Sequence, residues 1–170
     1  MEQFQSKRAV QTGVMKLAAS PRQVFPLLCP KREYDWIPIW QCRMIYSDTG
    51  FAENNGIFYT DFREDRGPEW WVVTRYEPCR TIEFIRLAPG LRITRLDIHL
   101  AGDGPEGTIA TWTQTMTALS PEGNSYIDRY GDSSYSQEIK ALEEMLNHYL
   151  QTGTMVNPAG HASQHDRPQE

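Results

Sequence analysis

Residues 108–118 read TIATWTQTMTA, and this stretch decides the fold class. Threonines occupy every second position from Thr111 to Thr117, while Trp112 and Gln114 stand between them. Because neighbouring side chains of a strand point to opposite faces of a sheet, the threonines form a ladder on the solvent side and the alternate residues point inward. The stretch therefore predicts a strand in a sheet with one solvated face and one buried face.

The segments before this strand show strand patterns of the same kind. The sequence predicts a first strand at 10–17 and further strands at 43–46, 57–62, 70–76, 81–87 and 91–100, with turn residues such as Asn55-Gly56 between them. By alternation, Ile82, Phe84 and Ile98 point inward, whereas Arg95, Asp97 and His99 point outward. The strand at 70–76 has apolar residues at both parities and receives no face assignment. Even spacing with turns between the strands predicts an antiparallel meander.

Helix signals flank this run of strands. Ser20-Pro21 is an N-cap followed by proline at the first helical position, and it predicts a short helix that ends before Pro30. A second short helix is expected at 31–36, whereas Pro121 and Gly123 are interpreted as a turn. One long helix is predicted at 134–150, with Ser134 and Gln137 forming a capping box. Its apolar stripe consists of Tyr135, Ile139, Leu142, Leu146 and Tyr149. Of these, Ile139, Leu142 and Leu146 are expected to pack against the concave face of the sheet.

The predicted architecture is α+β. A curved antiparallel sheet of about seven strands wraps around the long C-terminal helix, and two short helices follow the first strand. We expect one domain at 8–153 and a disordered tail at 154–170, where the residues are almost all polar.

Composition excludes several classes of function. The net charge of −5, from 17 basic and 22 acidic residues, argues against nucleic acid and membrane partners. No apolar run approaches the roughly 18 residues of a membrane span, and no signal peptide is visible, so a cytoplasmic location is expected. A monomer or a homodimer is expected. Cys29, Cys42 and Cys79 are interpreted as buried thiols. No metal site and no cofactor are expected, because ligand spacing is absent among His99, His148, His161 and His165.

Several short motifs accompany this order of elements: Ser20-Pro21 with Val24-Phe25, the segment from Glu33 to Trp40, Trp71-Val72-Val73 before Tyr76-Glu77-Pro78, and Thr111-Trp112-Thr113 leading to Gly123-Asn124. Together they resemble the START-like, or SRPBCC, superfamily, whose helix-grip fold is shared with Bet v 1-type allergens and bacterial polyketide cyclases. The resemblance covers residues 10–153. Relatives carry a Pro-Gly step after the first helix, and here Ile39 follows Pro38 instead. The resemblance implies an apolar cavity between the sheet and the long helix, able to hold small hydrophobic molecules or lipids.

The candidate pocket lies beneath the aromatic segment from Glu33 to Trp40. The two tryptophans of this segment line the pocket or serve as core packing. Gln114 binds a ligand carbonyl or hydroxyl, or its amide is satisfied by ordered water or by a cross-strand neighbour. Arg86, Arg92 and Thr94 share the inward parity near strand ends, where arginine can reach solvent or meet an anionic ligand group. The predicted pocket residues are Trp36, Trp40, Phe84, Ile98, Trp112, Gln114, Met116, Leu142 and Leu146.

Three functions are compatible with these features. The leading hypothesis is non-covalent binding of a small hydrophobic or amphipathic molecule. An enzyme of the polyketide cyclase/dehydratase type is the first alternative, with Glu33 and Tyr34 as the only acid/base candidates and no second inward carboxylate or histidine to complete a mechanism. The second alternative is an interaction module similar to the Hsp90-activator branch, for which the sequence shows no large exposed apolar patch.

Overall fold

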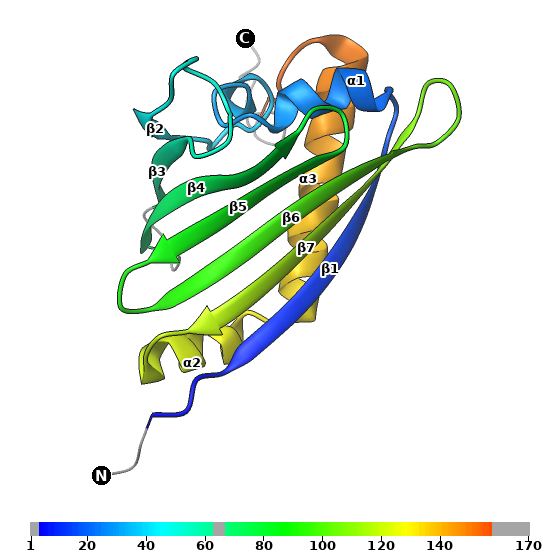
Figure 1. The fold of residues 1–170 in the computed structure, drawn as a ribbon. Coiled ribbons are helices and arrows are strands. Elements are labelled where there is room, and N and C mark those ends of the chain that lie inside the picture. Colours follow the sequence, from blue (N-terminus) through cyan, green and yellow to red (C-terminus); the bar gives the residue numbers. More distant parts are fainter. Residues whose placement is uncertain (1–3, 63–66, 158–170) are drawn as a thin grey trace, which may run out of the picture.

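The computed structural model describes residues 4–62 and 67–157. Its centre is one antiparallel sheet with the strand order β1-β7-β6-β5-β4-β3-β2 (Figure 1). The predicted meander is confirmed, and the first strand pairs with the last. The strands are β1 (Arg8–Leu17), β2 (Arg43–Tyr46), β3 (Ile57–Phe62), β4 (Gly67–Glu77), β5 (Thr81–Ala88), β6 (Arg92–Gly102) and β7 (Thr108–Ala118).

The helices gather on one face and at the two ends of this sheet. The long helix α3 (Asp132–Thr152) crosses one face, the short helix α1 (Pro21–Val24) lies at one end, and α2 (Pro121–Arg129) lies at the other (Figure 1). Two 3-10 turns, η1 (Phe25–Leu28) and η2 (Glu33–Asp35), follow α1. The α+β helix-grip architecture is confirmed, including the two short helical segments after the first strand.

Two helix predictions need correction. Ser120-Pro121 begins a helix, α2, where the sequence analysis expected only a turn; the Ser120 hydroxyl accepts a hydrogen bond from the Gly123 N–H at 3.1 Å. Gly123 does not end a helix but permits a close approach, since a Cβ there would lie 2.0 Å from the Leu91 carbonyl oxygen. The long helix begins at Asp132 with Gly131 as its N-cap, so the predicted capping box at Ser134 is wrong.

The predicted face assignment of the sheet is confirmed. Buried and partly exposed residues alternate along the whole of β7, with Trp112 and Gln114 buried on the side of α3. On β6, Leu96 and Ile98 are buried while Arg95 and His99 are exposed. We call the face that α3 covers concave and the opposite face convex.

The strand that the sequence could not orient contains a β-bulge. The register between β4 and β5 shifts between Val73 and Arg75, so the inward parity changes within the strand. Trp71 and Val73 are buried before the bulge, and Tyr76 packs against the core after it. Apolar residues at both parities are the expected signature of such an extra residue.

Helix α3 is fastened along β1. A Cβ on Gly13 would lie 2.6 Å from Cγ1 of Ile139, so only glycine allows the helix to approach this closely. The Lys16 N–H donates to Glu143 Oε2 at 2.6 Å, and the Ala18 N–H donates to Asn147 Oδ1 at 2.9 Å. Asn147 Nδ2 in turn donates to the Lys16 carbonyl at 2.9 Å. Contact along one edge leaves space between α3 and the remaining strands.

The other sequence-level predictions have mixed outcomes. Cys29 is buried as predicted, but Cys42 and Cys79 are only half-buried; all three thiols are free. Most of the predicted tail, residues 158–170, lies outside the described residues, and so do His161 and His165. Across residues 4–62 and 67–157, no helix combines the length and apolar character of a membrane span. The same residues bring together no group of three potential metal ligands.

Candidate functional site

A cavity of about 1080 Å³ lies between the concave face and α3. Strands β3 to β7 supply one wall and the inner face of α3, with Ile139, Leu142 and Met145, supplies the other. The segment that follows η2 contributes Ile37 and Trp40 at one end, which we call the mouth, and α2 contributes Tyr126 at the opposite end. The volume slightly exceeds the usual range of small-molecule sites, roughly 300–1,000 Å³.

Three rings form an aromatic wall on the sheet side of the cavity. Phe58 stacks on Trp71 with centroids 5.1 Å apart, and Phe84 meets both rings edge-on at 5.9 and 5.6 Å. The sequence identified only Phe84. Trp71 was missed because the bulge obscured the parity of β4, whereas Phe58 could have been found from the alternation of β3, where Phe58 and Thr60 are buried.

Six of the nine predicted pocket residues line the cavity: Trp40, Phe84, Ile98, Trp112, Gln114 and Leu142. Trp40 is half-buried, and its Nε1–H donates to the Pro30 carbonyl at 2.8 Å. Its ring lies 6.3 Å from that of Trp71, so it joins the mouth of the cavity to the aromatic wall. Leu142 is half-buried because the cavity occupies the space beneath it.

The remaining three predicted residues lie elsewhere. Trp36 is fully buried core, and its Nε1–H donates to the Leu27 carbonyl at 2.9 Å. Leu146 is likewise fully buried core. Met116 belongs to a second, smaller core beneath α2. This core was not expected, because α2 was not predicted as a helix. The aromatic segment therefore serves both of its alternative roles, with Trp36 in the packing and Trp40 at the cavity.

Glu33 and Tyr34 do not act as a pair. Glu33 lines the cavity, and its carboxyl makes no hydrogen bond or ion pair to any described residue. Burial without a compensating partner raises the pKa of Glu33 to about 8. Tyr34 is exposed, and its hydroxyl donates to the Cys42 carbonyl at 2.8 Å and accepts from the Cys42 N–H at 2.9 Å. Tyr34 thus braces the loop and does not line the cavity.

Gln114 has the cross-strand partner that the sequence left open. Its Nε2 donates to Gln11 Oε1 at 2.8 Å, and Gln11 Nε2 donates onward to Asp132 Oδ1 at 3.2 Å and to the Tyr130 carbonyl at 3.3 Å. This chain of amides ties β7 and β1 to the junction between α2 and α3. It holds the Gln114 side chain in one orientation at the cavity wall.

Trp112 and Tyr135 place two further polar groups near the cavity. The Tyr135 hydroxyl donates to the Trp112 carbonyl at 3.0 Å, and burial raises its pKa. The Trp112 Nε1–H is buried at the cavity and has no hydrogen-bond partner among the described residues. Nearby, Tyr130 donates a short hydrogen bond to Glu138, and both residues line the cavity. A ligand acceptor near Trp112 would satisfy the indole donor.

Three charged side chains are buried on the concave face. Arg86 and Arg92 point inward as predicted, yet neither reaches solvent as the sequence analysis had allowed. The reason is Glu69, which accepts a hydrogen bond from Arg92 Nη2 at 2.8 Å. Glu69 was not predicted as an inward residue because the predicted strand begins at Trp70, whereas β4 starts at Gly67. Aromatic rings complete the arrangement, with Arg86 over Trp71 and Arg92 over Tyr126.

Comparisons with known proteins identify the fold. Neither protein-family models nor curated protein sequences give a match. Norcoclaurine synthase from Thalictrum flavum, solved in complex with dopamine and hydroxybenzaldehyde, superposes with a TM-score of 0.64 at 12% identity, over 86% of this chain and 88% of that chain. Mll3558 from Rhizobium loti gives a TM-score of 0.59 at 16% identity, over 82% and 99%.

CalU16 from Micromonospora echinospora gives a TM-score of 0.58 at 13% identity, covering 90% of this chain and 87% of that chain. At such identities the likeness concerns architecture, since one fold hosts many functions. The strand order, the helix across the concave face and these neighbours agree: the chain has the helix-grip fold of the Bet v 1 type.

Proposed function

We propose that the protein binds a small, largely apolar molecule in the cavity between the concave face and α3. The observation that carries this proposal is the cavity itself, of about 1080 Å³ and walled by Phe58, Trp71, Phe84, Trp112 and Leu142. Apolar surface of this extent facing an internal space favours an occupant that removes it from water. The unsatisfied indole donor of Trp112 supplies a polar contact that would orient such an occupant.

A neutral fluorescent probe, phenylnaphthylamine, tests the proposal by titration. We expect a saturable one-to-one complex with the purified protein. Trp40→Ala should weaken the complex by about tenfold, because the variant removes a ring from the mouth of the cavity. Trp70→Ala is the matched control, since Trp70 is exposed on the convex face and should leave the affinity unchanged. Absence of saturable binding to the wild-type protein would overturn the proposal.

Glu33 supports a second candidate, the cyclase/dehydratase type of enzyme. A carboxyl with a pKa near 8 that faces a cavity can both donate and accept a proton near neutral pH. Under this alternative, Glu33→Gln abolishes turnover of a poly-β-keto substrate while phenylnaphthylamine still binds. The pH profile of turnover should then have an inflection near 8. If no such substrate is turned over by the wild-type protein, the binding function stands alone.

The interaction-module alternative is supported by an exposed apolar row on the convex face of the sheet. Trp70, Leu87 and Ile93 are exposed, and pairing across β4, β5 and β6 places them in one row of the convex face. Tyr59 extends the row, with its ring centroid 5.0 Å from that of Trp70. Trp70→Ser is the variant that would disturb this function and spare the cavity.

A further inference from the structure

Arg86 is a buried cation at the wall of the cavity. Only 9% of the residue is exposed, and its guanidinium lies 4.7 Å from the centroid of the Trp71 ring in the aromatic wall. Its Nε is inaccessible to solvent and has no hydrogen-bond partner among the described residues. Arg129 is the other arginine that lines the cavity, and it is exposed, so water solvates its charge. Arg86 is far less exposed than Arg129, and its guanidinium faces the cavity.

The nearest carboxylate is already engaged. Glu69 Oε1 accepts from Arg92 Nη2 at 2.8 Å, whereas Arg86 Nε lies 3.9 Å from Glu69 Oε2, beyond hydrogen-bond distance. Glu69 and Arg92 neutralise each other, so the second guanidinium leaves this cluster with one positive charge. Among the described residues, none of the other acidic groups lining the cavity, Glu33, Asp61 and Glu138, forms an ion pair with Arg86.

A buried charge without a matched hydrogen-bonding partner is costly, and a bound anion removes most of that cost. The planar guanidinium fork fits an oxyanion with two parallel N–H···O contacts, and charge-assisted contacts of this kind are about twice as strong as neutral ones. The aromatic wall beside the guanidinium provides a flat apolar surface for the body of the same molecule.

We propose that Arg86 binds an oxyanion, a carboxylate or a sulfonate, at one end of a ligand whose aromatic body lies against Phe58, Trp71 and Phe84. This inference rests on the proposed binding function and names the class of ligand: an aromatic acid in preference to a neutral apolar molecule. The Trp112 indole N–H, farther along the sheet, donates to an acceptor elsewhere on the same molecule.

Two matched probes separate the two proposals. Anilinonaphthalene sulfonate is phenylnaphthylamine with an added sulfonate, so the pair differs by the anion alone. We expect Arg86→Met to weaken the sulfonate by about tenfold and to change the affinity of phenylnaphthylamine by less than about twofold. Arg95→Met is the control, because Arg95 lies on the convex face of the neighbouring strand and should leave both affinities unchanged.

A wild-type competition experiment avoids any dependence on the variant's folding. Naphthoate and naphthamide, equal in size and different in charge, displace phenylnaphthylamine from the unaltered protein. We expect naphthoate to compete at least about fivefold better. Equal competition, or equal sulfonate affinity in wild type and a folded Arg86→Met, overturns the role of Arg86 and leaves the binding function intact. Failure of the wild-type protein to bind either fluorophore overturns the binding function itself.

Discussion

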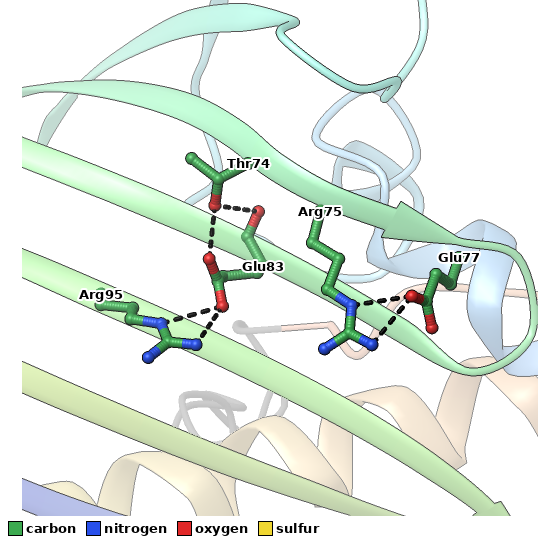
Figure 2. Close-up of polar contacts among 5 residues, drawn as sticks. All are labelled: Thr74, Arg75, Glu77, Glu83 and Arg95. Carbon is green, nitrogen blue, oxygen red and sulfur yellow. Dashed lines mark hydrogen bonds and ion pairs between the residues drawn. The ribbon is translucent and has the colours of Figure 1, made fainter.

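The two faces of the sheet carry the same kind of ion pair in opposite surroundings. On the concave face, Arg92 of β6 meets Glu69 of β4 at 2.8 Å, and neither side chain is more than 1% exposed. On the convex face, Arg95 of β6 meets Glu83 of β5 at 2.5 Å, and the Arg95 side chain is 58% exposed. Figure 2 shows the convex pair with Thr74, which also donates to Glu83 at 2.8 Å.

The difference between these pairs is one of solvation. Water stabilises the convex arginine whether or not its partner is present, so that pair contributes little to folding. The concave pair has no water to replace a lost partner, and each group therefore depends on the other. The ion pair on the convex face therefore contributes little to stability, whereas the pair on the concave face is required for it. Arg86 lies beside the concave pair, where a bound anion would compensate its charge.

The largest expected effect comes from removing one carboxylate on each face. Glu69→Gln leaves buried guanidiniums uncompensated and should lower the free energy of unfolding by about 3–5 kcal/mol. Glu83→Gln should cost about 1 kcal/mol or less, because the arginine it leaves behind is solvated. Urea unfolding of the two variants measures both values. Equal losses would show that the two faces do not differ in this way.

Two isoleucines of one strand sharpen the same comparison without charge. Ile98 is 1% exposed on the concave face, and Ile93 is 37% exposed on the convex face. Truncation to alanine should cost about 2–5 kcal/mol at Ile98 and under about 1 kcal/mol at Ile93. The readout is the urea midpoint of each variant at constant m-value. A loss at Ile93 as large as at Ile98 would mean that the convex row is covered in solution.

Glycines test the contact between helix and sheet. Gly13→Ala places a methyl group against Ile139 and should destabilise the protein by about 1–3 kcal/mol through overpacking. Gly102→Ala meets nothing within 4 Å, so its effect should be within about 0.5 kcal/mol. Thermal unfolding distinguishes these outcomes. If Gly13→Ala left the stability unchanged, the close packing of α3 against β1 would be contradicted.

The last expected effect is a pH dependence at the mouth of the cavity, small over any one pH unit although larger when summed over the whole range. Burial raises the pKa of Glu33 from 4.5 to about 8, so between these values the unfolded chain releases a proton that the folded chain retains. Stability that is fully present below pH 4.5 should therefore be lost as the pH rises towards 8, at up to about 1.4 kcal/mol per pH unit. The contribution stays flat above that range. Glu33→Gln should remove this slope, whereas the exposed Glu106→Gln should keep it.

Most of the fold could be predicted from the alternation of apolar and polar residues in the strands. Alternation in β7 predicted the inward side of Trp112 and Gln114, because a strand has a fixed period of two. The same rule failed in β4, where the bulge after Val73 changes the parity within one strand. Helix α2 was missed although Ser120-Pro121 repeats the signal of Ser20-Pro21; the adjacent Gly123 was interpreted as a turn residue, and its close contact with Leu91 is visible only in three dimensions.

The candidate site was less accessible to sequence reasoning than the fold. Periodicity identifies which side of a strand a residue occupies, but not whether that side meets core or empty space. Leu142 and Leu146 share one helix stripe, yet Leu142 lines the cavity and Leu146 is core. The same holds for the aromatic segment, where Trp40 lines the cavity and Trp36 is core. The engagement of Arg92 by Glu69 joins strands that are not neighbours in the sheet, a relation that no local pattern contains.

The contacts between α3 and β1 also cover part of one edge of the sheet. A sheet edge presents unpaired N–H and carbonyl groups to which another chain can add a strand. Here β1 is one edge, and Glu143 and Asn147 occupy the outward N–H groups of Lys16 and Ala18 and the carbonyl of Lys16. The other edge, β2, is only four residues long and contains a register shift. Two helix side chains thus cover the C-terminal end of this edge, and their loss would expose its N–H and carbonyl groups to another strand even where stability is little changed.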